Sequence, residues 1–109
     1  MRYAVLGDIH ANLEALEAVL AHIDGQRVDA CLCTGDIVGY GADPVTCLEL
    51  VHDTCLYIVQ GNHDEMAASN EPPENFNAWA EQAGMWTRGR VRAHPGQRAR
   101  GLPPRVPPP

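Results

Sequence analysis

One pattern constrains this chain more than any other: three times, a short apolar run is followed by glycine and then by a side chain able to bind metal. The runs cover residues 3–6, 30–33 and 55–59, and their lengths are typical of buried β-strands. Parallel strands are usually covered on both faces, so we expect the same here. The polar endings are Gly7-Asp8-Ile9-His10, Gly35-Asp36 and Gly61-Asn62-His63-Asp64.

Two stretches with helical periodicity separate the three runs. Apolar residues recur at helical spacing from Leu13 to Ile23, and a shorter, less regular pattern follows Pro44. This order predicts a βαβαβ unit, and therefore an α/β fold with parallel strands and right-handed crossovers. All three polar endings then meet at the carboxyl edge of the sheet, where open α/β sheets bind ligands. A weaker helical pattern covers residues 76–88.

Asp8 and His10 alone have an ordinary explanation, because an aspartate can cap the following helix and a histidine can pack locally. The other two endings change this balance, because together they supply the ligands of a two-metal site. Asp36 can bridge two cations, with Asp8 and His10 binding one and the Asn62 carbonyl the other. His63 is then free to act as a general acid or to stabilise charge near the leaving group.

These motifs resemble those of the calcineurin-like metallophosphoesterases, in which D-x-H, G-D and G-N-H-D/E follow one another in this order. The resemblance covers residues 1 to about 65 and is strongest to small bacterial and archaeal members. It implies the N-terminal half of a four-layer sandwich and two divalent ions, such as Mn, Fe, Zn or Ni. It also implies hydrolysis of phosphomonoesters or phosphodiesters, with Asp8, His10, Asp36 and Asn62 as metal ligands and His63 as the catalytic histidine.

The sequence departs from the family pattern at two places. Gly39-Tyr40-Gly41 stands where many members continue to G-D-x-x-D, which weakens an assignment to the protein phosphatases. A later lone histidine and a G-H-x-H motif are missing, and His94 matches neither. We therefore expect an incomplete metal site that binds ions weakly. The alternative to an enzyme is a non-catalytic truncated remnant or a cation-binding module.

Charge is distributed unevenly along the chain. All fourteen acidic residues lie at or before Glu81, whereas six of the eight basic residues lie at or after Arg88. The acidic body argues against nucleic acid binding by the core, because phosphate backbones require basic surfaces. Residues 1–90 are expected to form a partial metallophosphoesterase domain, and residues 91–109 a disordered tail rich in arginine, proline and glycine. Such a tail is expected from a truncated or frame-shifted product, although a natural disordered tail is the alternative.

The remaining features concern the cellular location and the partners of the protein. We expect a cytoplasmic protein, because no signal peptide or membrane-spanning run is recognisable and the four cysteines fall in apolar stretches typical of buried thiols. A nucleotide-binding module is poorly supported, since neither G-x-G-x-x-G nor G-K-[ST] occurs. The expected partner is a small phosphate-ester substrate, and we expect no membrane binding. The sequence leaves the oligomeric state open.

Overall fold

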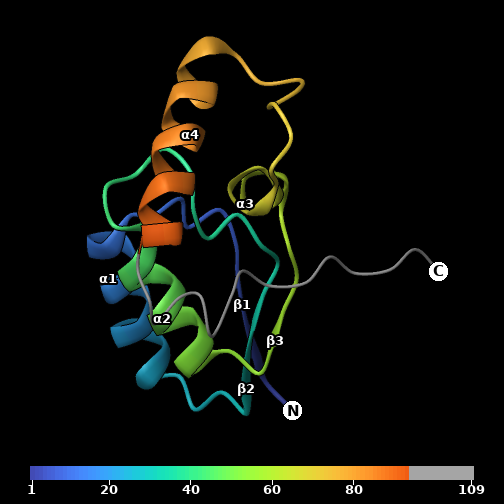
Figure 1. The fold of residues 1–109 in the computed structure, drawn as a ribbon. Helices are drawn as coiled ribbons and strands as arrows, with labels where there is room; N and C mark the ends of the chain where they lie inside the picture. The colour runs from blue at the N-terminus through green and yellow to red at the C-terminus, as the bar shows by residue number, and fades with distance from the viewer. Residues whose placement is uncertain (94–109) are drawn as a thin grey trace, which may run out of the picture.

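The structure, a computed structural model, describes residues 1–93. Strands and helices alternate through the first five elements, and two helices follow (Figure 1). In chain order the elements are β1 (Tyr3–Leu6), α1 (Leu13–Asp24), β2 (Ala30–Cys33), α2 (Pro44–Thr54), β3 (Tyr57–Ile58), α3 (Asn62–Ala68) and α4 (Ala78–Ala93). The predicted α/β fold and its βαβαβ order are therefore confirmed.

The three strands form a parallel sheet in the order β1-β2-β3. Leu6 pairs with Cys33, and Cys33 pairs with Ile58, so these three residues form one row across the sheet. The chain leaves every strand at the same edge, because the strands are parallel. All three polar endings therefore lie at this edge.

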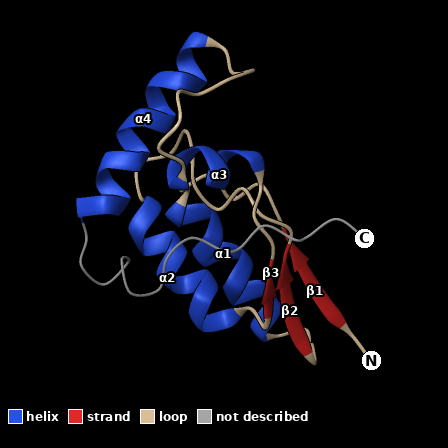
Figure 2. Ribbon diagram, turned by 45° about the vertical axis from the view of Figure 1, so that its right-hand side comes forward, coloured by secondary structure: helices blue, strands red, loops and turns tan. Residues whose placement is uncertain are grey.

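The prediction that the strands are covered on both faces is wrong. Right-handed crossovers that advance in one direction, from β1 to β2 to β3, place α1 and α2 on the same face of the sheet. Figure 2 shows both helices on that side. On the other face, Val5 is 63% exposed and Tyr57 is 69% exposed. Within residues 1–93, the sheet is thus buried on one face only.

The core lies between this covered face and the helices. Ile37, Val38, Leu48 and Val51 are fully or almost fully buried. Two of them come from α2 and two from the loop after β2, so the core extends directly beneath the carboxyl edge of the sheet. The loop that carries the second polar ending is therefore anchored by its apolar residues.

The helices differ in detail from the sequence prediction. Helix α1 begins as expected, with the side chain of Asn12 accepting a hydrogen bond from the backbone nitrogen of Ala15 at 3.1 Å. Helix α3 begins at Asn62, so the third polar ending is the first turn of a helix rather than a loop. Helix α4 continues through Ala93, beyond the expected start of the tail at residue 91.

Contacts made by α4 explain its additional length. Val91 is buried, and the guanidinium of Arg92 donates hydrogen bonds to the carbonyl of Ser69 and to the side chain of Asn70. These contacts stabilise the last turn, which the sequence pattern alone did not indicate. The rest of the expected disordered tail, residues 94–109, lies outside the described residues.

Two further findings concern the cysteines and the possibility of a membrane-spanning helix. All four cysteines are buried and free of disulfide bonds. Within residues 1–93, the helices are too short or too polar to cross a membrane.

Candidate metal centre

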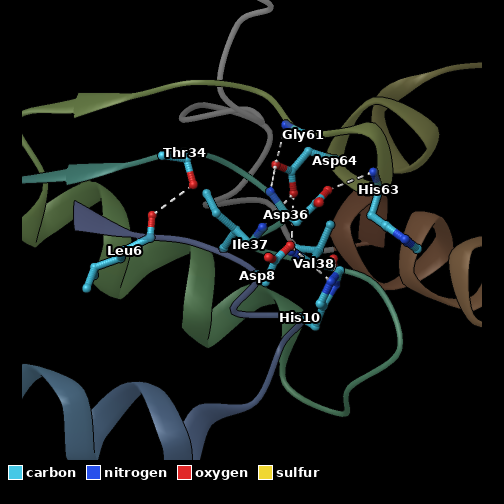
Figure 3. A network of polar contacts seen from close by, with 10 residues as sticks. All are labelled: Leu6, Asp8, His10, Thr34, Asp36, Ile37, Val38, Gly61, His63 and Asp64. Carbon is cyan, nitrogen blue, oxygen red and sulfur yellow. Dashed lines mark hydrogen bonds and ion pairs between the residues drawn. The ribbon is translucent and has the colours of Figure 1, made fainter.

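Asp8, His10 and Asp36 meet at the carboxyl edge of the sheet (Figure 3). Each offers one ligand atom, and the three atoms lie within 4.8 Å of one another. Asp8 and His10 follow β1, whereas Asp36 follows β2, so the cluster depends on the parallel pairing of these strands. The structure therefore brings together three of the four predicted metal ligands.

Backbone hydrogen bonds hold the two loops of this cluster side by side. The backbone nitrogen of Asp8 donates to the carbonyl of Gly35 at 3.2 Å, and that of His10 donates to the carbonyl of Asp36 at 2.9 Å. Asp8, His10 and Asp36 all have φ values near +50°. Such values are uncommon for residues with a side chain, and the surrounding structure must maintain them. The loops thus hold the backbones of Asp8, His10 and Asp36 close together.

The orientation of His10 suits metal binding through one ring nitrogen. Its Nδ1 lies 3.1 Å from the carbonyl oxygen of Val38, which is an acceptor, so Nδ1 carries the proton. Its Nε2 lies 3.6 Å from Oδ1 of Asp8 and remains available as a ligand. A backbone carbonyl that selects the tautomer is a common arrangement around metal-binding histidines.

Asp36 is oriented by the third polar ending. Its Oδ1 accepts a hydrogen bond from the backbone nitrogen of His63 at 3.0 Å. A side chain at Gly61 would collide with the Asp36 carboxylate, so glycine is required at this position. One oxygen of Asp36 is therefore engaged by α3, and the other can bind an ion.

Asp64 is the residue that the sequence reasoning missed. It is fully buried, and its carboxylate accepts hydrogen bonds from the backbone nitrogens of Asp36, Ile37, Val38 and Gly61 at 2.8–3.1 Å. Burial raises its pKa, and the hydrogen bonds from Gly61, Val38 and Asp36 oppose that rise. The available signal was its place as the fourth residue of Gly-Asn-His-Asp, three residues after the helix N-cap.

His63 lies beside the cluster within a group of aromatic rings. Its ring centroid is 4.8 Å from that of His10, 4.9 Å from Tyr40 and 5.2 Å from Phe76. The side chain is 9% exposed, and its buried Nδ1 has no hydrogen-bond partner. Burial lowers the pKa of His63, whereas the nearby Asp36 carboxylate acts in the opposite direction. The Nδ1 of His63 packs against Gly39, so the site contains one buried polar atom without a hydrogen bond.

Asn62 is exposed at the first position of α3. It lies between Gly61 and His63, which are both next to Asp36. It also lines a cavity formed by α3, α4 and the segment between them. Its role as a ligand of a second ion stays a prediction.

The donor set fits one divalent cation. One imidazole nitrogen and two carboxylates lie close enough to share an ion, and without a cation the carboxylates of Asp8 and Asp36 would repel each other. A second ion would depend on Asp36 and Asn62. The structure thus supports a metal-ligand group formed by Asp8, His10 and Asp36.

Fold and site together define a class of protein, namely a parallel α/β domain with metal-binding donors at the carboxyl edge of its sheet. Comparison with known proteins gives this class a family. The profile of the calcineurin-like phosphoesterases matches residues 1–98, and the chain belongs to this family. The resemblance drawn from the motifs is confirmed.

Individual relatives agree with this assignment. The chain is 48% identical over 86 residues to the uncharacterized protein MJ0912 of Methanocaldococcus jannaschii, which covers 78% of this chain. It is 31% identical over 84 residues to serine/threonine-protein phosphatase 1 of Salmonella typhimurium, which covers 75% of this chain. The crystal structure of a metallophosphoesterase from Sphaerobacter thermophilus superimposes with a TM-score of 0.71 and 42% identity over 94% of this chain.

These relatives are much longer than the present chain. It spans 35% of the Methanocaldococcus protein, 38% of the Salmonella phosphatase and 42% of the Sphaerobacter structure.

Proposed function

We propose that this chain forms the metal-binding part of a phosphoesterase that hydrolyses small phosphomonoesters or phosphodiesters. The observation that carries the proposal is the convergence of Asp8, His10 and Asp36 within 4.8 Å at one edge of the sheet. Family membership supplies the reaction class. The proposed cofactors are two divalent ions of the Mn, Fe, Zn or Ni type. The buried free thiols support a reducing, cytoplasmic setting.

Each residue of the site has a distinct task in this proposal. Asp8 and the Nε2 of His10 would hold one ion, and Asp36, whose carboxylate is oriented by the backbone of His63, would contribute a ligand to both ions. Asn62 is proposed as a ligand of the second ion. Bound divalent ions supply Lewis acidity for the phosphate and lower the pKa of bound water.

His63 is proposed to act at the leaving group. Its ring lies against that of His10 and is held between Tyr40 and Phe76, so its position is fixed relative to the metal ligands. A proton or hydrogen bond donated there stabilises the charge that develops on the leaving oxygen.

A second candidate function is a cation-binding module without turnover. The observation that favours it is the ligand count, because the described residues bring together three donors, enough for one cation but few for two. This module would bind a divalent ion but would not hydrolyse phosphate esters.

One experiment separates these functions. The full chain is titrated with Mn²⁺, and bound metal is measured together with turnover of p-nitrophenyl phosphate and its bis ester. Asp36→Asn should lose metal binding by at least about tenfold, because it removes a ligand charge. Asp24→Asn, at the exposed end of α1, is the matched control. Metal binding with turnover supports the phosphoesterase, metal binding without turnover supports the module, and absence of metal binding contradicts both.

A further inference from the structure

A cavity of about 440 Å³ opens directly beside the candidate metal centre. Asp8 and His10 form part of its wall, and the remainder comes from the start of α1 and from the loop before α2. Its volume lies within the range of about 300–1,000 Å³ that is usual for ligand sites. A molecule bound at Asp8 and His10 would therefore extend into this space.

Tyr40 forms the aromatic side of the cavity. Its ring centroid lies 5.3 Å from that of His10 and 4.9 Å from that of His63, and the residue is 52% exposed. It thus contacts both histidines of the site and still presents apolar surface to solvent. Planar groups pack favourably against such a ring, in stacked or edge-on geometry.

The loop holds Tyr40 in place without a ligand. Tyr40 has a φ of 63° and Gly39 a φ of 99°, so two successive residues adopt left-handed conformations. The backbone nitrogen of Gly41 donates a hydrogen bond to the carbonyl of His10 at 3.0 Å, which ties the loop to the metal-binding residues. A bulky residue with positive φ persists only where its surroundings enforce it. Little ordering is therefore needed when a ligand packs on this ring.

The charge of the cavity restricts what it can accept. Glu14 and Asp43 line it in addition to Asp8, whereas neither lysine nor arginine is found among its lining residues. An ion bound by Asp8 would offset that carboxylate, but Glu14 and Asp43 would still repel an anion in the cavity. A leaving group that carries further phosphates or carboxylates is therefore disfavoured.

We propose that this cavity binds the leaving group of the phosphate ester, and that Tyr40 makes it select planar aromatic groups without negative charge. This inference rests on the proposed function and adds a substrate class to it. It assigns to Tyr40 a direct contact with substrate and to Glu14 and Asp43 the rejection of anionic leaving groups.

Binding of non-hydrolysable phosphonates tests this inference without turnover. Calorimetric titration of the full chain in Mn²⁺ compares phenylphosphonate with methylphosphonate. We expect phenylphosphonate to bind about five- to tenfold more tightly, as a single aromatic contact allows. Tyr40→Phe should retain this preference because it keeps the ring, and Tyr40→Leu should abolish it. Tyr57→Leu, on the open face of the sheet, is the matched control and should leave the preference unchanged.

The charge requirement is tested with 4-carboxyphenylphosphonate. It should bind about threefold more weakly than phenylphosphonate. Glu14→Gln should remove most of that difference, whereas Glu17→Gln, one turn further along α1 and not part of the cavity wall, should not.

The outcomes separate the inference from the proposed function. Equal binding of phenyl- and methylphosphonate, or a preference that survives in Tyr40→Leu, overturns the inference and leaves the phosphoesterase proposal intact. Failure of the Mn²⁺-loaded chain to bind either phosphonate overturns the proposed function and the inference with it.

Discussion

The carboxylate of Asp64 accepts a hydrogen bond from the backbone nitrogen of Asp36 at 2.8 Å, so a buried charge in α3 holds the backbone of a candidate metal ligand. The same carboxylate binds the next two backbone nitrogens of this loop and that of Gly61. Asp36 in turn accepts a hydrogen bond from the backbone of His63. The second and third polar endings are therefore connected in both directions, and the position of Asp36 depends on Asp64.

Replacing Asp64 with asparagine tests this connection. The amide group of Asn would bring a donor against backbone donors and remove the charge, so we expect a loss of about 3 kcal/mol in the free energy of unfolding. Urea denaturation measures this loss, and the Mn²⁺ affinity should fall as well because Asp36 is displaced. Asp24→Asn should change stability by less than about 0.5 kcal/mol. An Asp64→Asn variant as stable as the wild type would show that the four hydrogen bonds matter little.

Gly39→Ala tests the packing of His63. An added Cβ would lie 2.8 Å from the Nδ1 of His63, and the φ of 99° is strained for any residue with a side chain. We expect a loss of about 1–2 kcal/mol in stability and displacement of the His63 ring, seen as a changed imidazole resonance by NMR. Gly89→Ala in helix α4 is the control: apart from the backbone of the helix itself, the added methyl meets no atom within 4 Å, so this variant should gain about 0.5–1 kcal/mol. Equal stability of the two variants would contradict the prediction.

Arg88 is expected to be essential for the attachment of α4. Its guanidinium is buried and donates hydrogen bonds to the carbonyl of Met66 and to that of Glu71. Arg88→Met would leave these carbonyls unpaired, at a cost of about 2–4 kcal/mol in urea denaturation. Arg90 lies exposed over the ring of Trp86 at 5.5 Å, so Arg90→Met should cost less than about 1 kcal/mol. Similar losses in both variants would argue against a specific role for Arg88.

The local features of the fold could be predicted from the sequence. The apolar runs at residues 3–6 and 30–33 and the helical spacing of α1 are properties of neighbouring residues, and the structure reproduces them. The carboxyl-edge position of Asp8, His10 and Asp36 followed from the parallel βαβ rule alone. The sequence pattern and the rules for strand connections were therefore sufficient to predict that these three donors lie close together.

The remaining features depend on contacts between distant segments, which periodicity does not contain. The sheet has an open face because its strand order places both crossover helices on the other face. The sequence pattern does not show this, because a short apolar run is compatible with a strand that is covered on one face or on both. The roles of Asp64 and Tyr40 also depend on partners more than twenty residues away in the sequence. Arg88 and Arg92, two of the three arginines of α4, belong to the basic C-terminal part of the sequence, but both bind carbonyls around the end of α3.

The thiol of Cys47 should make stability dependent on pH in the alkaline range. Burial raises its pKa from 9.0 to about 11, with smaller contributions from Asp43 and Glu14. A raised pKa means that the folded state holds the proton more tightly than the unfolded state. The resulting stabilisation is complete below pH 9.0 and is lost as the pH rises toward about 11. Urea denaturation under reducing conditions should therefore show a steeper decrease over this interval for the wild type than for Cys47→Ala. Parallel pH profiles for the two proteins would show that the thiol ionises as readily in the folded chain as in the unfolded one.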